Sequence, residues 1–549
     1  MKKRNLLILV SLFSLSSINL ISCDDETISS SDDTIKIQLE GYKEKNYVLD
    51  ETVTNENGSV SYEIFVRSFK DSDGNGTGDF NGVKEELPYL KDLGVKTLWL
   101  MPIHESPTYH GYDVIDYYGV NADYGTMDDF KSLVDTAKTY NIDIMIDMVF
   151  NHSSTQNQWF IDSYNDYKSN NTSKGSKKDW YCWSTNGRSG YSYYKNDLNA
   201  YYESRFDSSM PDFNTENEEV RAEFIKILKH WVDIGVKGFR FDAVKYFAYE
   251  TTAYNTEFLS FIADTIKAYD DSIYFVGECW DSINIINDYY KSSFDSFFKF
   301  NGSLAGFGND AILGQVKGIN KSNSFGDLIQ KQEKTLKENN PNGYSSYFLA
   351  NHDTDRASHS FNTNEYAKMA ASLLMTLPGT PFMYYGEEIM LKGQRETNDH
   401  SDARRRLPMI WDKNDKTGEC AFPETNRTDL MENTQVTDGV KQQLETDYSV
   451  LNHYKKMINI RNKYPFMKES VFTNLTSNIN QEHDNVLAYK LSYGDEYVII
   501  IHNFEKVNVE IDVSTFATSI VDEASTSKLI PELVDGKLKI GTMSTVILK

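Results

Sequence analysis

Residues 219–246 read EVRAEFIKILKHWVDIGVKGFRFDAVKY, and this stretch contains the unit that decides the fold. Apolar residues recur at helical spacing in 219–234, and the apolar run 236–242 that follows has the length of a buried strand. The helical pattern returns at 258–268 and 366–377. The eight runs that predict strands are 62–69, 95–102, 142–150, 236–242, 273–278, 293–300, 347–351 and 381–386. Strands that alternate with helices in this way predict an α/β fold, the parallel (β/α)₈ or TIM barrel.

Two regions break the alternation. Residues 152–208 are rich in Ser, Asn, Lys and Tyr without a clear period, which predicts an irregular subdomain inserted after the third strand. From residue 466 to 549 the chain shows strand-like alternation without helices, as in VLAYKLSY at 486–493. We therefore expect a barrel domain over 59–465, which includes the inserted subdomain 152–208. A C-terminal antiparallel β-sandwich is expected over 466–549.

The composition excludes some classes of protein. The chain has 549 residues, of which 40% are apolar and 25% charged, so it can bury a large core and is not a disordered chain. It carries 81 acidic and 56 basic side chains, a net charge of −25. We do not expect a nucleic-acid partner, because proteins that bind nucleic acids need a basic surface.

The N-terminus has the pattern of an export signal. Basic residues at positions 2–4 precede an apolar segment at 6–21, which is short for a helix that spans a bilayer. The tetrapeptide Leu20-Ile21-Ser22-Cys23 resembles a bacterial lipobox, in which Cys23 becomes the acylated first residue. We therefore predict a signal peptide over 1–22 and an acidic, Ser-rich linker over 23–58. This implies an exported protein that is lipid-anchored to a bacterial cell membrane, with the outer membrane and a surface-facing position as one option.

The other cysteines do not form a framework. Cys182, Cys279 and Cys420 remain when Cys23 is lipidated, and three cysteines cannot pair completely. Disulfide bonds are therefore not expected to hold this exported chain together.

Polar residues cluster where the predicted strands end. Alone, an Asp at such a position is more often a helix cap or a turn residue. In a barrel, however, the C-terminal ends of all strands form one face, which carries the active site. The residues that follow the strands are Asp147, His152, Arg240, Asp242, Glu278, His352 and Asp353. Paired carboxylates on one face predict the chemistry of a retaining glycosidase, one acting as nucleophile and the other as acid/base.

Six ordered motifs carry a resemblance to a known family. They are GVKTLWLMPI (94–103), DMVFNH (147–152), MPDFN (210–214), GFRFDAVKY (238–246), VGECW (276–280) and FLANHD (348–353), and HGYDVIDYYGV (110–120) and GTPFMYYGEE (379–388) fit the same pattern. The chain resembles the α-amylase family, glycoside hydrolase family 13. The resemblance covers about residues 60–465 as barrel and implies an α-glucan substrate.

The resemblance implies roles for individual residues. Asp242 matches the nucleophile, Glu278 the general acid/base, and Asp353 the third carboxylate that holds sugar hydroxyls. Arg240 lies two positions before Asp242 on the same side of its strand, where its charge should keep Asp242 ionised. Glu278 should instead have a raised pKa, so that it holds a proton. The further residues implied in substrate binding are Tyr112, His152, Lys245 and His352, together with Arg240.

One position departs from the family pattern. Many α-amylases have His after the residue that matches Lys245, whereas this chain has Tyr246. The side-chain contribution of that position is therefore an open question.

A second constellation suggests a metal. Residues 71–79 read DSDGNGTGD, with oxygen donors at alternate positions, which suits a hard cation. The twelfth position of an EF-hand would be Gly82 rather than Glu, so an EF-hand is not expected. The stretch resembles the calcium loop of oligo-1,6-glucosidases and related amylases, which implies Ca²⁺ as cofactor. The implied ligands are the side chains of Asp71, Asp73, Asn75 and Asp79 and the carbonyl of Thr77. A second site near Asn151 and Asp212 stays open.

The leading hypothesis is a monomeric, retaining hydrolase of α-1,4 bonds in starch-like glucans or maltooligosaccharides. The motif MPDFN is intermediate between relatives that act on α-1,4 links and those that act on α-1,6 links, so a neopullulanase or an oligo-1,6-glucosidase-type α-glucosidase is the alternative. A more remote alternative is a non-catalytic glucan-binding lipoprotein. Such proteins tend to lose one of the three carboxylates, and this chain keeps Asp242, Glu278 and Asp353.

Overall fold

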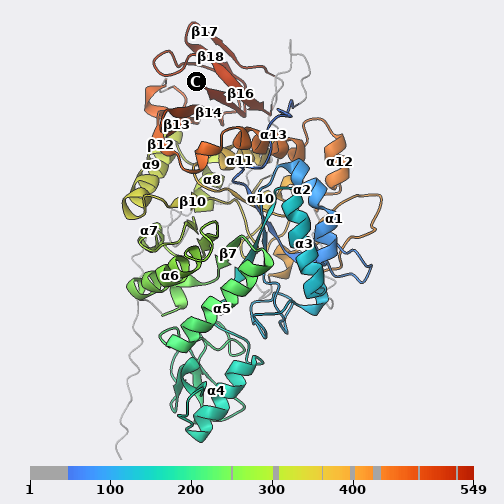
Figure 1. The fold of residues 1–549 in the computed structure, drawn as a ribbon. Helices are drawn as coiled ribbons and strands as arrows, with labels where there is room; N and C mark the ends of the chain where they lie inside the picture. Colours follow the sequence, from blue (N-terminus) through green and yellow to red (C-terminus); the bar gives the residue numbers. More distant parts are fainter. Residues whose placement is uncertain are drawn as a thin grey trace, which may run out of the picture. The chain divides into compact units, whose positions relative to one another are not determined.

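A computed structural model describes residues 47–248, 251–300, 308–361, 363–395, 402–424, 435–479, 482–526 and 529–549 (Figure 1). Eight parallel strands form one sheet in the order β10-β9-β8-β7-β3-β2-β1-β11. Their bounds are β1 Ser61–Ile64, β2 Thr97–Leu100, β3 Asp143–Met148, β7 Gly238–Phe241, β8 Tyr274–Gly277, β9 Ser296–Phe298, β10 Tyr344–Ser346 and β11 Phe382–Tyr384. A parallel bridge between Phe348 and Phe382 connects β10 to β11 and closes the barrel, as the sequence predicts.

The helices lie between the strands. Their bounds are α1 Phe80–Glu85, α2 Leu87–Leu93, α3 Met127–Thr139, α4 Gln158–Ser169, α5 Glu218–Ile234, α6 Thr252–Lys267, α7 Ile283–Tyr289, α8 Gly308–Val316, α9 Ser322–Asn339, α10 Ala357–Ser360, α11 Asn364–Thr376, α12 Val440–Glu445 and α13 Val450–Lys463.

The unit α5–β7 shows why this sequence folds as it does. The Asn217 side chain caps the first turn of α5 by accepting hydrogen bonds from two backbone amides. Gly235 ends the helix in a left-handed conformation (φ 109°), which glycine adopts without strain. Every residue of β7 is buried, as expected for a parallel strand that is covered on both faces.

Seven of the eight predicted runs overlap the strands of the barrel, and the run 347–351 does not. The strand β10 is Tyr344–Ser346, which precedes the predicted run 347–351. The apolar pattern does not predict β10, because two of its three residues are serines. Serine hydroxyls can be buried here because they find hydrogen-bond partners inside the protein. Ser345 donates to Glu333 (2.6 Å), and Ser346 lies 2.6 Å from the hydroxyl of Ser296 on β9.

The segment inserted after β3 is more regular than its sequence suggests. It contains α4 and a small antiparallel sheet of β4 Trp183–Ser184, β6 Tyr201–Glu203 and β5 Tyr191–Tyr193, in that order. Aromatic rings form its core, with Phe160 of α4 stacked on Trp183 (5.4 Å between centroids) and meeting the edge of Tyr202 (4.9 Å). Aromatic packing rather than aliphatic periodicity therefore organises this subdomain.

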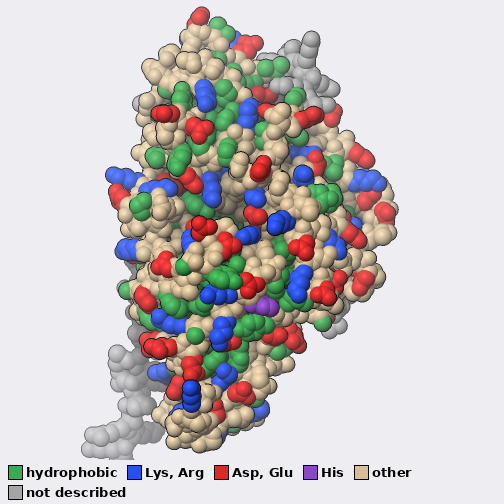
Figure 2. Space-filling model, viewed as in Figure 1, with side chains coloured by type: hydrophobic (Ala, Val, Ile, Leu, Met, Phe, Trp, Pro, Cys, Tyr) green, Lys and Arg blue, Asp and Glu red, His purple; other side chains and the backbone are tan. Residues whose placement is uncertain are grey.

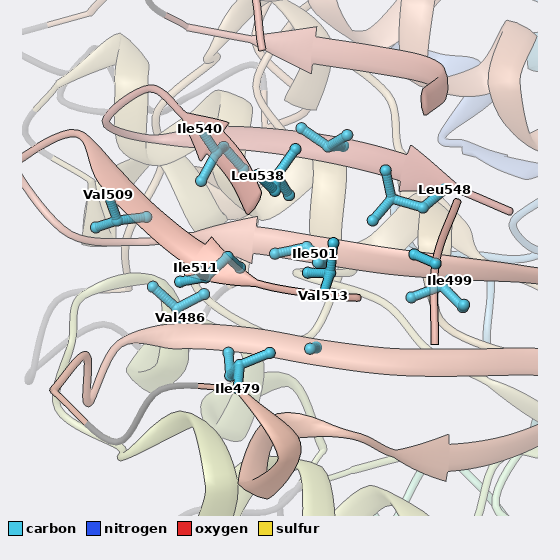
Figure 3. Close-up of a cluster of buried hydrophobic side chains, with 13 residues drawn as sticks. Ile479, Val486, Ile499, Ile501, Val509, Ile511, Val513, Leu538, Ile540 and Leu548 are labelled. Atoms are coloured by element: carbon cyan, nitrogen blue, oxygen red, sulfur yellow. The ribbon is translucent and has the colours of Figure 1, made fainter. Parts of the chain in front are cut away.

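The C-terminal region is an antiparallel sandwich, as predicted. One sheet has the order β12-β13-β14-β19-β16 and the other β15-β18-β17. The bounds are β12 Val471–Asn474, β13 Val486–Tyr493, β14 Glu496–Asn503, β15 Val509–Asp512, β16 Ile520–Ser525, β17 Glu532–Val534, β18 Lys537–Ile540 and β19 Ser544–Leu548. Aliphatic side chains from both sheets meet in the core that Figure 3 shows, including Ile499, Ile501, Ile511 and Leu538.

Part of the predicted linker makes contacts with the folded protein. The hydroxyl of Tyr47 lies 2.7 Å from His453 of α13, and the backbone amide of Asp50 donates to Asn459 (2.9 Å). Cys23 and the predicted signal peptide lie outside the described residues. Cys182, Cys279 and Cys420 are free thiols.

Charges are mixed on the surface. On the face in Figure 2, Lys and Arg side chains are interspersed with Asp and Glu, without a continuous basic patch. No helix among the described residues is long and apolar enough to span a bilayer.

Candidate active site

Arg240 is the centre of the site. It projects from β7 into the barrel, 1% exposed, and Asp242 follows on the same side of the strand. Its Nη1 donates to Asp242 Oδ1 (2.7 Å) and to Asp147 Oδ1 of β3 (2.8 Å), and its Nη2 lies 3.3 Å from Glu278 Oε2. One guanidinium therefore holds three carboxyl groups from the ends of three neighbouring strands.

Glu278 is oriented from a second side. It follows β8 directly, and its Oε2 accepts a hydrogen bond from the backbone amide of Ala243 (2.8 Å). Ala243 has a left-handed conformation (φ 50°), which is uncommon for a residue with a side chain. This backbone geometry turns the amide that follows Asp242 toward Glu278 and links the two carboxyl groups.

Burial controls the protonation of this pair. Burial raises the pKa of Asp242 to about 6, although the charge of Arg240 acts to lower it. Burial, together with the neighbouring carboxylates Asp242 and Asp353, raises the pKa of Glu278 to about 7 against the charge of Arg240. The expected elevation for Glu278 is therefore present. Arg240 acts in the expected direction on Asp242, but burial outweighs it.

Asp353 has the opposite environment. It follows β10 together with His352, whose Nε2 lies 2.8 Å from Asp353 Oδ2, and Arg406 donates to Asp353 Oδ1 (3.0 Å). Burial would raise the pKa of Asp353, but the charges of His352 and Arg406 outweigh it and hold the pKa well below its usual range. Asp353 is therefore the carboxyl group of the three that stays ionised most firmly.

His352 is itself held by two carboxylates. Its Nδ1 is hydrogen-bonded to the buried Glu63 of β1, and burial alone would lower its pKa. The carboxylates of Asp353 and Glu63 outweigh burial and raise the pKa of His352 to about 9. A protonated imidazole can donate from both nitrogens, so His352 bridges Glu63 and Asp353.

Tyr112 and His152 form one wall. The Tyr112 ring stacks on His352 (5.6 Å between centroids, 16° between planes), and its hydroxyl donates to Asp147 (3.2 Å). His152 Nε2 lies 3.1 Å from the backbone oxygen of Tyr112. The ring of Tyr112 therefore has a fixed orientation, which suits a flat platform for a sugar.

Lys245 and Tyr246 also line the cavity. Lys245 Nζ donates to the backbone oxygen of Trp280 (2.8 Å) and lies 3.3 Å from Asp281. Tyr246 packs against Phe206 of the inserted subdomain (4.9 Å between centroids). The position that departs from the family pattern thus contributes an aromatic ring to the edge of the site.

These residues surround a cavity of about 820 Å³. The lining residues are Tyr109, His110, Tyr112, His152, Phe206, Met210, Asp242, Ala243, Lys245, Tyr246, Glu278, Trp280, Asp353, Asp402, Arg406 and Glu424. A cavity of this size suits a ligand of several sugar units rather than a single ion. The carboxyl groups of Asp242, Glu278 and Asp353 face this common space, whereas Arg240 and His352 act from behind them.

The sequence reasoning missed Arg406 and undervalued Asp147. Arg406 lies about 50 positions after Asp353 in a run of three arginines, where a solvated surface is the ordinary interpretation. Asp147 ends an apolar strand, which was its only signal. Both are buried, and both contact groups that the sequence does predict.

The predicted metal loop gathers three carboxylates. Oxygen atoms of Asp71, Asp73 and Asp79 lie within 4.8 Å of one another, and Asp71 and Asp79 are buried. Backbone amides of Gly74 (2.8 Å) and Gly76 (2.7 Å) orient the carboxylate of Asp71. This cluster of hard oxygen donors fits Ca²⁺.

Two other predicted ligands lie in the same loop. The side-chain oxygen of Asn75 accepts a hydrogen bond from the backbone amide of Thr77 (2.7 Å). Asn75 is exposed, so its side chain can turn toward a cation that binds to the three carboxylates. Near the second candidate position, Asn151 donates to Asp212 (3.1 Å), and burial raises the pKa of Asp212 to about 8.

A closed (β/α)₈ barrel with three carboxyl groups converging in a sugar-sized cavity at the C-terminal ends of its strands defines a glycosidase. The family model for the catalytic domain of α-amylase matches residues 63–470. The chain therefore belongs to the α-amylase family and is a glycosidase.

Several relatives match most of the chain. It is 34% identical to α-amylase 3 of Dictyoglomus thermophilum, over 94% of this chain and 96% of that protein. It is 28% identical to oligo-1,6-glucosidase of Parageobacillus thermoglucosidasius, over 82% and 90% of the two chains. The structure of Eubacterium rectale Amy13B is similar with a TM-score of 0.84 and 32% identity, covering 92% of this chain and 99% of that one.

Proposed function

We propose that this protein is a retaining hydrolase of α-1,4-linked glucans, with Asp242 as nucleophile and Glu278 as general acid/base. The observation that carries the proposal is the convergence of Asp242 and Glu278 on the single guanidinium of Arg240 at the cavity wall. The pKa order supports this assignment, because the nucleophile must lose its proton before the acid does.

The reaction has two steps. Asp242 attacks the anomeric carbon, the glycosidic bond breaks, and Glu278 gives its proton to the leaving oxygen. Glu278 then removes a proton from water, whose oxygen displaces Asp242 from the same carbon. Asp353, ionised and fixed by His352 and Arg406, accepts hydrogen bonds from sugar hydroxyls and offers negative charge near the oxocarbenium-like transition state.

Linkage specificity is the finer part of the proposal. The α-1,4 preference is supported by the relative named α-amylase, whereas a second relative is named oligo-1,6-glucosidase. The test is product analysis on amylose, pullulan and isomaltose. Internal cleavage of amylose with little action on isomaltose supports the proposal. Rapid hydrolysis of isomaltose with no action on amylose would replace it with the α-1,6 alternative.

The loop of residues 71–79 is proposed to hold Ca²⁺. Asp71, Asp73 and Asp79 would supply carboxylate oxygens, with the Asn75 side chain and the Thr77 carbonyl completing the shell. A divalent cation there offsets most of the negative charge of the three gathered carboxylates and stabilises the loop between β1 and α1. The role is structural, because none of the loop residues lines the cavity.

Lipid anchoring at Cys23 is a separate proposal that rests on the sequence of residues 1–23. We expect Cys23→Ser to move the enzyme from the membrane fraction to a soluble one, because stable anchoring needs the acyl chains of a modified cysteine. Fractionation and mass analysis of the mature N-terminus provide the test. Membrane retention of an unmodified Cys23→Ser protein contradicts the proposal.

A further inference from the structure

The small sheet of the inserted subdomain has one aromatic face that points outward. Tyr193 of β5 pairs with Tyr201 of β6, and Tyr191 pairs with Glu203, so these four side chains share a face. The alternate pair, Ser192 and Tyr202, lies on the inner face, where Tyr202 is buried against α4. We name Tyr191, Tyr193 and Tyr201 the tyrosine face.

Neighbouring groups fix the rings of this face, and Tyr193 is the exposed one, whereas Tyr191 and Tyr201 are half-buried. Tyr193 is 50% exposed, and its ring meets the edge of Tyr201 at 6.0 Å. The guanidinium of Arg188 lies over Tyr191 (4.1 Å) and donates to its hydroxyl. Rings held in this way lose little conformational entropy when they bind a ligand.

The tyrosine face is close along the chain to the catalytic cavity. The chain runs from Tyr201 along β6 to Arg205, which pairs with Glu203 (2.7 Å), and then to Phe206, which lines the cavity. Phe206 is 48% exposed and packs against Tyr246. Five residues of extended chain span at most about 17 Å, so the path from Tyr201 to the cavity is the length of a short oligosaccharide.

We propose that the tyrosine face binds the part of an α-glucan chain that extends beyond the catalytic cavity. This inference rests on the proposed function, since it names long α-glucans as the substrate class. The chemistry of a glucan fits the surface: each sugar ring has an apolar face that stacks on an aromatic ring, and its hydroxyls pair with Tyr hydroxyls and with Glu203. An α-glucan is the occupant that this position favours, because at most about 17 Å of chain separates Tyr201 from Phe206 at the cavity in which the glucan would be cleaved.

The test compares a long substrate with a short one. We expect Tyr193→Ala to lower the ratio of kcat/KM for amylose to kcat/KM for maltotriose by about threefold or more, because one stacking platform is lost. Tyr193→Trp restores the ratio, since it keeps a flat ring. Tyr269→Ala is the matched control: Tyr269 is 51% exposed but lies on a different surface, beyond α6, and its removal leaves the ratio unchanged.

A binding measurement separates this inference from the proposed function. In the inactive Glu278→Gln background, migration through a native gel that contains amylose should be retarded, and Tyr193→Ala should relieve part of that retardation. Equal retardation and an equal kcat/KM ratio in Tyr193→Ala and Tyr269→Ala overturn the inference. If the active enzyme cleaves neither amylose nor maltotriose, the proposed function fails, and the gel still decides whether the tyrosine face binds glucan.

Discussion

The C-terminal end of the barrel and the core of the C-terminal sandwich are both buried, but the first contains charged side chains and the second aliphatic ones. At the barrel end, Arg240 and Asp147 are almost fully buried, and Asp242 and Glu278 contact the same guanidinium. The sandwich core consists of Ala, Val, Ile and Leu side chains (Figure 3). One centre gathers charge away from water, and the other excludes charge.

The contrast indicates what each centre is for. Burying ions costs several kcal/mol per ion before pairing, and apolar replacements of a buried ion pair are often equally stable or more stable. A charged centre is therefore a poor choice for stability and a good one for chemistry, since burial shifts the pKa values of Asp242 and Glu278 toward neutrality. The aliphatic core of the sandwich contributes burial free energy, and none of its buried side chains titrates.

The largest expected effect is on the charged centre. We predict that Asp242→Asn lowers kcat by at least about 1,000-fold, because an amide of similar shape cannot attack the anomeric carbon. The affinity for maltotetraose, measured by titration calorimetry, should change little. The free energy of unfolding should not fall by more than about 1 kcal/mol, because Asn has nearly the same shape and Arg240 keeps Asp147 and Glu278 as partners. Retention of more than about a tenth of the activity would show that Asp242 is not the nucleophile.

A substitution in the aliphatic core of the sandwich should lower stability and leave activity unchanged. Ile501→Ala removes a fully buried side chain from the sandwich core, and we predict a loss of about 2–5 kcal/mol in the free energy of unfolding. Specific activity of the folded protein should stay near the wild-type value. Val507→Ala, at a 57% exposed position of the same region, is the control and should change stability by less than about 0.5 kcal/mol. A loss of activity in folded Ile501→Ala protein would mean that the two centres are coupled.

The same contrast explains what the sequence could predict. Apolar runs such as 142–150 predicted strands because buried parallel strands are apolar on both faces, and strand ends then placed Asp242, Glu278 and Asp353 on one face. β10 was misplaced because its serines are buried with partners on other elements, which a local pattern does not contain. Arg406 was missed for the same reason: its partner Asp353 is distant in sequence, and only the folded chain brings them together.

The loop of residues 71–79 combines gathered charge with a position near the surface, so its stability should depend on a cation. We predict that chelation lowers the melting temperature by a few degrees and that Ca²⁺ restores it. A cation at a hundred times its Kd contributes about 2.7 kcal/mol. Differential scanning calorimetry with and without a chelator is the measurement.

Variants can assign that response to the loop. Asp73→Ala removes the exposed carboxylate of the cluster and should abolish the effect of the chelator. Asp128→Ala, at an exposed acidic position on α3, should preserve it. A full response in Asp73→Ala protein would move the cation to another site, such as the position near Asn151 and Asp212.

The smallest effect is the dependence of the rate on pH, which only the charged centre should set. Asp242 must be ionised to attack, so kcat/KM should rise with pH up to its pKa of about 6. Glu278 must be protonated to release the leaving group, so the rate should fall as pH rises beyond about 7. Each limb should change the rate by about tenfold per pH unit, and the pair should titrate with two apparent pKa values that belong to both carboxyl groups.

Ile501→Ala is the control for this prediction and should keep both limbs unchanged. In Glu278→Gln, a substrate whose leaving group needs no proton, such as a dinitrophenyl maltoside, should give a burst of phenolate that lacks the alkaline limb. An alkaline limb that persists in this burst would assign the proton to a group other than Glu278.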